Sequence, residues 1–488
     1  MEFVMSIWTF FAKNILQQPA FFIGLLVLIG YALLKKPFYE VVAGFLKATV
    51  GYLILTVGSN GLINQCRPVI AGLKTKFNLE AVIMDPYYGT SAITAGLNDI
   101  GRSFSQAMLL LLIAFIFNIV LVAFRKVTKI RSLFTTGHIQ VQQATMAFWL
   151  ILWAFPNLAD TPVLIIMGIL LGIYWAVGSN LTVDICQEMT DGGGFCIAHQ
   201  QMFGVKLTEW LAPKIGKMGK KESKSLDEIE LPGWTSIFSD NVVTTSIIML
   251  LFFGTLMLVL GKQFLIDNGF MGAADSYFFY ILKFSLNFAV YLRILNLGVS
   301  MFVAELTQSF QGIATKLLPG AVPGVDVPAI YAYAPANTVP LGFIAAAIGQ
   351  FLVVIGLIIF KSPVLVMAGF VPIFFGDGTL ATFANYKGGV RAAVVIPFLS
   401  GIVVALGTAL CSNLFGLASY GGYNSLFDWV TVWPVFTLGM KYLGYIGVAL
   451  AAVVMLAIPQ IQYARHKDTY FLITDDYEAY KKLKEEKK

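Results

Sequence analysis

Two short polar clusters interrupt an otherwise apolar chain, and their residue types could bind a solute. His138 and Gln142 are four residues apart, so on a helix the imidazole and the amide would share one face. His199 and Gln200 follow the glycine run 192–194, in a chain with only three histidines. Both groups donate and accept hydrogen bonds. We predict that these four residues bind a polar ligand; the structural alternatives are a capped helix start and a hydrogen-bonded loop histidine.

Two acids stand beside prolines and tyrosines. Tyr87 and Tyr88 follow Asp85, and Tyr331 follows Asp326. Carboxylate, phenol and amide groups all bond to hydroxyls, and aromatic rings stack on the apolar faces of sugars. These residues favour a sugar-like ligand, although the same acids could serve as proton relays in an ion-coupled carrier.

The elements that carry these residues are predicted to be membrane-spanning helices. The chain is 58% hydrophobic and 12% charged, with a mean hydropathy of +0.77, which excludes an ordinary soluble enzyme. Apolar runs such as 106–124 are continuous and do not alternate, so they predict helices and not the strands of a barrel. We expect an all-α polytopic membrane protein with about eleven spans, near 18–34, 40–58, 103–124, 143–156, 162–178, 242–260, 277–304, 338–360, 363–376, 392–416 and 430–458.

Basic clusters set the expected orientation. With the N-terminus outside, one face receives most of the cations: Lys35 and Lys36, the cluster 125–131, the lysine-rich loop 206–224 and the 465–467 region. The positive-inside rule makes that face cytoplasmic, together with the tail 461–488. Arg67, Lys74 and Lys76 do not fit this orientation.

An internal repeat is indicated by residues 53–92 and 293–335. The alignment places Gly58 on Gly298, Lys76 on Lys316 and, after one gap, Asp85 on Asp326. An odd number of predicted spans separates the two segments, as in inverted-repeat transporters. We therefore expect a single transporter unit over 1–460, with halves of about 1–235 and 236–460 and a re-entrant hairpin in each half. Two unrelated interfacial loops are the alternative.

Enzyme signatures are missing from the sequence. It contains no Walker loop, no GxSxG and no HExxH, so we expect no catalytic residue, and any phosphoryl carrier must be a separate chain. The cysteines, Cys66, Cys186, Cys196 and Cys411, lack the spacing of a metal site, and we expect neither a metal nor a cofactor. They are predicted to be small buried hydrophobic residues.

Five motifs together resemble one transporter family. They are TTGHIQVQQAT (135–145), TDGGGFCIAHQQMFG (190–204), LPGWTSIFSDNVVTT (231–245), MFVAELTQSFQGIATKLLPGAV (301–322) and GFVPIFFGDGTLATFANYKGG (369–389). The chain is similar over most of residues 20–460 to the ascorbate-specific enzyme IIC membrane component of the bacterial phosphotransferase system, the UlaA/SgaT family.

This resemblance implies an architecture and a reaction. The family's protomer has eleven helices, arranged as a V-shaped dimerising domain and a core domain that carries substrate by an elevator movement. The implied protein is a homodimer in the bacterial cytoplasmic membrane, surrounded by lipid, with no nucleic-acid partner. A separate IIB protein, itself supplied by IIA, would phosphorylate the captured L-ascorbate to ascorbate 6-phosphate.

Motif positions carry the family's ligand-binding role to six residues of this chain: Tyr87, His138, Gln142, His199, Gln200 and Asp326. The sequence differs from the family pattern at 87–90 and around Asp326, which leaves a related sugar acid or a pentitol open as the substrate. The alternative function is an ion-coupled or uncoupled carrier that has no phosphoryl partner.

Overall fold

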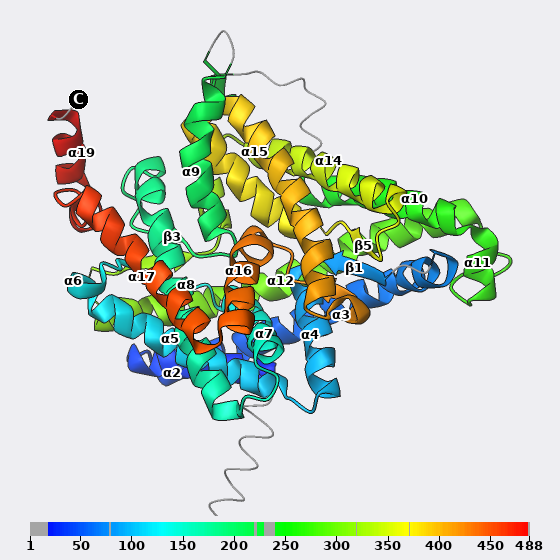
Figure 1. Cartoon of the computed structure of the whole chain (residues 1–488), viewed down its shortest axis with the longest axis horizontal. Helices are drawn as coiled ribbons and strands as arrows, with labels where there is room; N and C mark the ends of the chain where they lie inside the picture. Colours follow the sequence, from blue (N-terminus) through cyan, green and yellow to red (C-terminus); the bar gives the residue numbers. More distant parts are fainter. Residues whose placement is uncertain are drawn as a thin grey trace, which may run out of the picture.

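Helices dominate the computed structural model, which describes residues 18–77, 80–218, 222–228, 240–318, 320–369 and 371–486 (Figure 1). The helices of the first half are α2 (Pro19–Leu33), α3 (Phe38–Phe77), α4 (Pro86–Asp99), α5 (Phe104–Ala123), α6 (Arg125–Thr128), α7 (Gly137–Ala154), α8 (Asp160–Met189) and α9 (Met202–Gly216). Those of the second half are α10 (Asn241–Leu260), α11 (Lys262–Asp267), α12 (Tyr277–Leu317), α13 (Pro328–Tyr331), α14 (Thr338–Ile359), α15 (Gly378–Leu414), α16 (Phe427–Leu443), α17 (Tyr445–Arg465), α18 (Leu472–Asp475) and α19 (Tyr477–Glu486).

Seven helical stretches among the described residues are long and apolar enough to cross a membrane. They are Phe38–Leu62, Phe104–Ala123, Asp160–Met189, Tyr277–Leu306, Thr338–Ile359, Pro372–Leu414 and Tyr445–Arg465. Two shorter apolar helices cover Ile23–Leu33 and Thr245–Leu260. The prediction of a polytopic helical membrane protein is confirmed, whereas a count of eleven spans stays a prediction.

Helices α3 and α12 differ from the predicted hairpins. Each is continuous, over 40 and 41 residues, so residues 53–77 and 293–317 continue the helices of the preceding spans. Gly and Pro did not break them: Pro68 is accommodated inside α3. The expectation that the chain is interrupted within these stretches is therefore wrong, whereas a re-entrant hairpin in each half stays a prediction.

The glycines that the repeat alignment paired both lie where α3 and α12 pack closely together. A Cβ at Gly58 would overlap the backbone of Leu295, and a Cβ at Gly298 would overlap the backbone of Leu55. The two contacts are reciprocal, so α3 and α12 cross closely where both lack a side chain, as small residues permit between membrane helices. Each long helix is followed by a short strand, an aspartate and a proline-started helix. The repeat thus appears as two similar helix–strand–helix units.

The fold contains two small parallel sheets, and each sheet includes the strand that follows one of these long helices. One has the order β5 (Val364–Met367), β1 (Glu80–Met84), β6 (Gly422–Tyr423). The other has the order β2 (Ser132–Phe134), β4 (Val322–Val325), β3 (Cys196–Ile197). Strand pairing satisfies backbone groups that irregular chain would leave unbonded inside an apolar protein. The sequence analysis did not predict these strands, because each has at most five residues.

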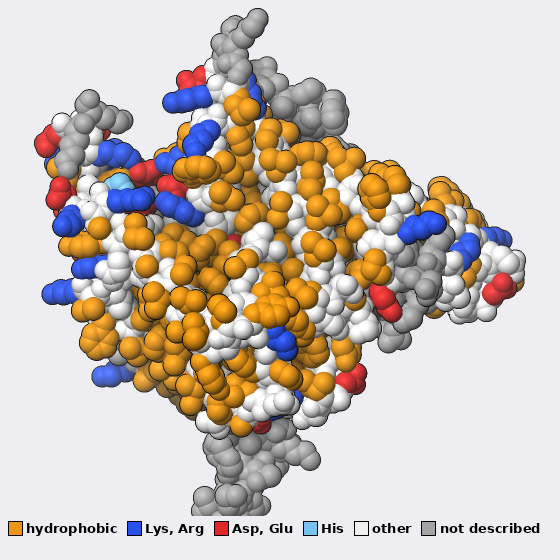
Figure 2. Space-filling model, in the orientation of Figure 1, with side chains coloured by type: hydrophobic (Ala, Val, Ile, Leu, Met, Phe, Trp, Pro, Cys, Tyr) orange, Lys and Arg blue, Asp and Glu red, His pale blue; other side chains and the backbone are white. Residues whose placement is uncertain are grey.

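The surface is apolar over most of the face drawn in Figure 2, and Lys and Arg side chains gather mainly near its margins. Exposed Leu, Ile and Val side chains from α5, α14, α15 and α17 belong to the apolar surface, as expected for helices in contact with lipid. Cys186, Cys196 and Cys411 are buried and unpaired, as predicted, while the side chain of Cys66 lies outside the description.

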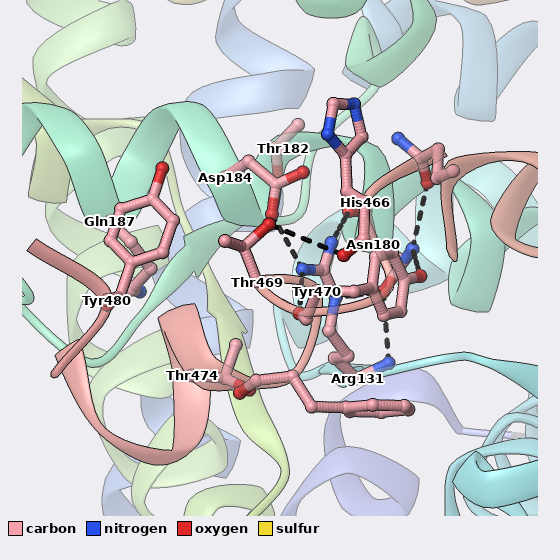
Figure 3. Close-up of polar contacts among 12 residues, drawn as sticks. Arg131, Asn180, Thr182, Asp184, Gln187, His466, Thr469, Tyr470, Thr474 and Tyr480 are labelled. Atoms are coloured by element: carbon pink, nitrogen blue, oxygen red, sulfur yellow. Dashed lines mark hydrogen bonds and ion pairs between the residues drawn. The ribbon is translucent and has the colours of Figure 1, made fainter. Parts of the chain in front are cut away.

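The C-terminal segment folds back onto the end of α8 and the turn before β2 (Figure 3). The guanidinium of Arg131 is fully buried and donates to Asp184 Oδ1 at 2.6 Å and to the Tyr470 carbonyl at 2.7 Å. It also lies 3.8 Å from the centre of the Tyr470 ring. Asn180 Nδ2 donates to the Tyr470 hydroxyl at 2.9 Å. The tail is therefore bound to the predicted basic cluster 125–131, and the two segments lie on the same face of the molecule.

Candidate functional site

The β2–β4–β3 sheet brings three of the predicted site residues together. Because its strands are parallel, their carboxyl ends meet at one edge. Asp326 directly follows β4, His199 follows β3 by two residues, and His138 follows β2 by four residues in the first turn of α7. Sequence-distant segments thus converge because each strand ends at the same edge.

Asp326 lies between the two imidazoles. Its Oδ2 is 3.6 Å from His138 Nε2 and its Oδ1 is 3.6 Å from His199 Nε2. Both distances exceed that of a direct hydrogen bond, so a hydroxyl or a water can bridge each gap. The Asp326 side chain keeps 23% exposure, whereas the histidines keep 6% and 3%. The carboxylate is thus the most accessible of the three groups.

The predicted glutamines form the second part of the site. Gln200 Nε2 donates to Gln142 Oε1, so the two amides are joined across α7 and the loop after β3. Tyr87 lies beside Gln142 and within electrostatic reach of Asp326. A small cavity of about 30 Å³ is lined by Tyr87, His138, Ile139, Gln142, His199, Gln200, Asp326, Val371 and Phe375. The structure therefore brings all six predicted residues to one cavity, which we call the inner cavity.

His138 Nδ1 and Gln200 Oε1 are two of the buried polar atoms at the inner cavity that have no hydrogen-bond partner within the described part of the chain. A buried polar group without a partner costs free energy, on the order of 1–3 kcal/mol. One atom is an amide acceptor, and the other donates or accepts according to the tautomer. A ligand with several hydroxyls could satisfy both atoms.

Asp85 and Tyr331 have structural contacts and do not line the inner cavity. Asp85 caps α4, since its Oδ1 accepts from the backbone N–H groups of Tyr87 at 2.8 Å and Tyr88 at 3.0 Å. It thereby fixes the first turn of α4, which carries Tyr87. Tyr331 donates to the Phe374 carbonyl at 3.1 Å. The residues thus position neighbouring segments, a role that the sequence pattern did not separate from ligand binding.

Sequence reasoning missed residues that hold the His199–Gln200 loop. Gln201 Oε1 lies 2.6 Å from His199 Nδ1, while its Nε2 donates to the Phe375 carbonyl at 2.9 Å. Asp428, from α16, accepts from the N–H groups of Phe203 at 3.1 Å and Gly204 at 3.2 Å, at the start of α9. Gln201 adjoins a predicted pair and could have been chosen; Asp428 gave no signal, because an acid in the first turn of a helix is ordinary.

A larger cavity of about 530 Å³ adjoins the inner cavity and shares Tyr87, His138 and Gln142 with it. Its remaining walls come mainly from α3 and α4. No group of three or more His, Cys, Asp or Glu residues that could hold a metal ion occurs among the described residues.

The apolar helices and the two adjoining cavities define a helical membrane protein with room for a small polar solute. The sequence matches the family described as "PTS system sugar-specific permease component", where PTS is the phosphotransferase system, over residues 14–429. The chain belongs to this family. A similar protein from Mycoplasma pneumoniae, named "Ascorbate-specific PTS system EIIC component", is 31% identical over 478 residues, covering 87% of this chain and 70% of that protein. The predicted resemblance is thereby confirmed.

Proposed function

We propose that this protein translocates L-ascorbate across the bacterial cytoplasmic membrane as the enzyme IIC component of a phosphotransferase system. A IIB protein would phosphorylate the captured sugar acid, delivering ascorbate 6-phosphate to the cytoplasm. The observation that carries the proposal is the inner cavity, which combines one carboxylate with imidazoles, amides and a phenol in a chain of the sugar permease family. The similar protein named as ascorbate-specific supports this particular substrate.

Charge suggests how ascorbate would lie. A carboxylate repels the anionic enolate of the ring and accepts hydrogen bonds from neutral hydroxyls. Asp326 would therefore bind the side-chain hydroxyls, and the ring would face Gln142, Gln200 and the imidazoles. This orientation leaves the hydroxyl that is to be phosphorylated on the acidic side of the cavity.

Phosphoryl transfer is assigned to the partner. The described cysteines, Cys186, Cys196 and Cys411, are buried, so none of them is placed to carry a phosphoryl group exchanged with a soluble protein. The chain would act by holding the substrate in position for IIB. IIB and, through it, IIA are the proposed protein partners.

The remaining features are proposed from the family resemblance. They are a homodimer, a V-shaped domain and a core domain that moves as an elevator, an N-terminus outside and a cytoplasmic tail over 461–488. The clustering of Arg125, Arg131 and the tail on one face supports a shared cytoplasmic side for these segments.

Uptake of labelled ascorbate tests the proposal. In cells that contain IIA and IIB, the wild type should accumulate ascorbate 6-phosphate, and removal of IIB should abolish that accumulation. Asp326→Asn keeps the shape and one acceptor but removes the charge, so it should weaken binding of ascorbate by roughly 1.5–3 kcal/mol. Accumulation of unmodified ascorbate that a protonophore abolishes would contradict the proposal and establish the ion-coupled carrier.

A further inference from the structure

The inner cavity alone is too small for a sugar acid. Its volume of 30 Å³ is room for about two water molecules, whereas the adjoining cavity has 530 Å³. A sugar acid bound at the shared residues Tyr87, His138 and Gln142 would therefore extend into the larger cavity. The walls of that larger cavity thus meet the solute, and they include residues that no family motif in the sequence identified.

Two polar stripes face this cavity from different helices. On α4 the stripe is Thr90, Ser91 and Thr94, which continue the helical face that carries Tyr87. On α3 the stripe is Tyr52, Thr56 and Asn60, at successive intervals of four residues.

The threonines and the serine on these stripes already donate their hydroxyl protons to the helix backbone, whereas Tyr52 and Asn60 keep donor groups. Thr90 donates to the Pro86 carbonyl at 2.8 Å, Ser91 to the Tyr87 carbonyl at 3.2 Å and Thr94 to the Thr90 carbonyl at 2.7 Å. On α3, Thr56 donates to the Tyr52 carbonyl at 3.0 Å. A hydroxyl that donates its one proton keeps lone pairs that accept. Toward the cavity, these four oxygens are therefore acceptors.

The larger cavity also lacks charged side chains. Its described lining contains no Asp, Glu, Lys or Arg, and the only histidine in that lining is His138. A row of acceptors without a nearby cation suits a solute that brings hydroxyl donors. It does not suit a phosphate group, whose oxygens are acceptors and which binds to cations and N–H groups.

We propose that this cavity is an acceptor-lined antechamber that binds the unphosphorylated, hydroxyl-rich substrate on its way to the inner cavity and disfavours the phosphorylated product. The inference rests on the proposed function, and it states from which side of the inner cavity the substrate arrives. Since product and substrate differ by the phosphate, the antechamber would make return of the product through this route unfavourable.

Thiol labelling tests access and selectivity together. Ser91→Cys in a Cys66→Ser background places one thiol in the antechamber while Cys186, Cys196 and Cys411 stay buried. A membrane-impermeant maleimide, added to intact cells and to inverted vesicles, should react from one side only. Excess ascorbate should slow that reaction at least threefold, and equal ascorbate 6-phosphate should not. The matched control is Ser419→Cys, an exposed serine outside both cavities, whose labelling neither compound should change.

Removal of the acceptors gives the second measurement. Thr90→Val and Thr94→Val keep the side-chain shape, and each should raise the Kd for ascorbate about two- to tenfold, the equivalent of one neutral hydrogen bond. Thr255→Val removes a hydroxyl that is bonded in the same way to the Leu251 carbonyl, but on the exposed face of α10, and should leave Kd unchanged.

The outcomes separate this inference from the proposed function. If the wild type shows IIB-dependent ascorbate uptake, but both compounds or neither slow the labelling of Ser91→Cys, the antechamber is overturned and the function stands. If the wild type takes up no ascorbate, the proposed substrate fails. In that case one-sided labelling of Ser91→Cys still supports an access chamber, and absence of labelling from both sides overturns it.

Discussion

At the scale of single residues, the inner cavity combines several hydrogen-bonding groups with little positive charge. Asp326 is the one acid among the described residues that line it, and the groups around Asp326 are imidazoles, amides and a phenol. Such a site distinguishes solutes by the pattern of their hydroxyls, because each polar group needs a partner of the right type. This favours selectivity over tight binding, which suits a carrier that must release its cargo.

Alanine substitution of the paired glutamines tests this arrangement. Gln142→Ala and Gln200→Ala should each weaken ascorbate binding by about 0.5–1.5 kcal/mol for a lost neutral hydrogen bond, and more where the other amide is left buried and unpaired. Isothermal titration of purified protein measures the effect. Because the two amides bond to each other, the double variant should lose less than the sum of the single losses. If a folded variant bound ascorbate with wild-type affinity, the substituted glutamine would not belong to the binding site.

The six predicted residues, all of which line the inner cavity, could be selected from the sequence because polar groups are costly inside a membrane protein and so mark cavities. Positions that act through backbone contacts could not. Asp428 holds the start of α9 from a different helix, and only the packing of α16 against the loop shows it. Thr90, Ser91 and Thr94 looked like ordinary small residues of a helix, since threonine and serine bond readily to their own helix backbone.

At the scale of elements, the close crossing of α3 and α12 depends on glycine. Gly298→Ala would press a methyl group into the backbone of Leu55, and Gly58→Ala would do the same at Leu295. Each variant should lose about 1–3 kcal/mol of stability, because the helices must separate to make room. Thermal unfolding in detergent checks this. Gly356→Ala on α14 is the control: no atom lies within 4 Å of its added Cβ, so it should be neutral or stabilising.

The tail contact is the second element that can be tested. Tyr470→Phe removes the hydroxyl bonded to Asn180 but keeps the ring over Arg131, and should cost about 0.5–1.5 kcal/mol. Tyr470→Ala also removes the ring and should cost more. Melting of the purified protein measures both. Tyr442→Phe, at a residue 79% exposed, should change nothing. Equal stability of all three variants would show that the tail contact does not contribute.

The elements also show where sequence reasoning stops. Hydropathy located most apolar helices, yet it predicted breaks in α3 and α12 where the structure has continuous helix. Gly and polar residues inside these helices serve the contact between them, and a periodicity argument does not distinguish such a contact from a re-entrant turn. The repeat alignment matched Gly58 with Gly298 because both positions lie in the close contact between α3 and α12, where only a residue without a side chain fits.

At the scale of the whole molecule, charge is concentrated away from the apolar surface (Figure 2). Residues 206–224, which the sequence analysis predicted to be a lysine-rich loop, are helical as far as Gly216, the end of α9, and α9 begins two residues after Gln200. Clustered cations steer association with acidic surfaces at low ionic strength. A soluble phosphocarrier with an acidic face is the partner that this surface fits.

Neutralisation of Lys214, Lys217, Lys220 and Lys221 to Gln tests that docking role. IIB-dependent uptake should slow severalfold at low salt, and the Kd for ascorbate should not change, because Lys214 and Lys217 line neither cavity. The same number of changes at Lys481, Lys482, Lys484 and Lys35 gives a control of equal net charge. If the uptake rate did not change, these lysines would not dock IIB and would serve only to orient the protein in the membrane.

The tail contact has a consequence for biogenesis. Tyr470 lies 339 residues beyond Arg131 in the chain, so the ribosome must translate those residues before the ring and carbonyl that cover this guanidinium exist. Until then Arg131 has Asp184 and Asn180 as its partners. The surroundings of Arg131, which begins the stretch that leads to His138, are therefore completed only after α17 has been synthesised.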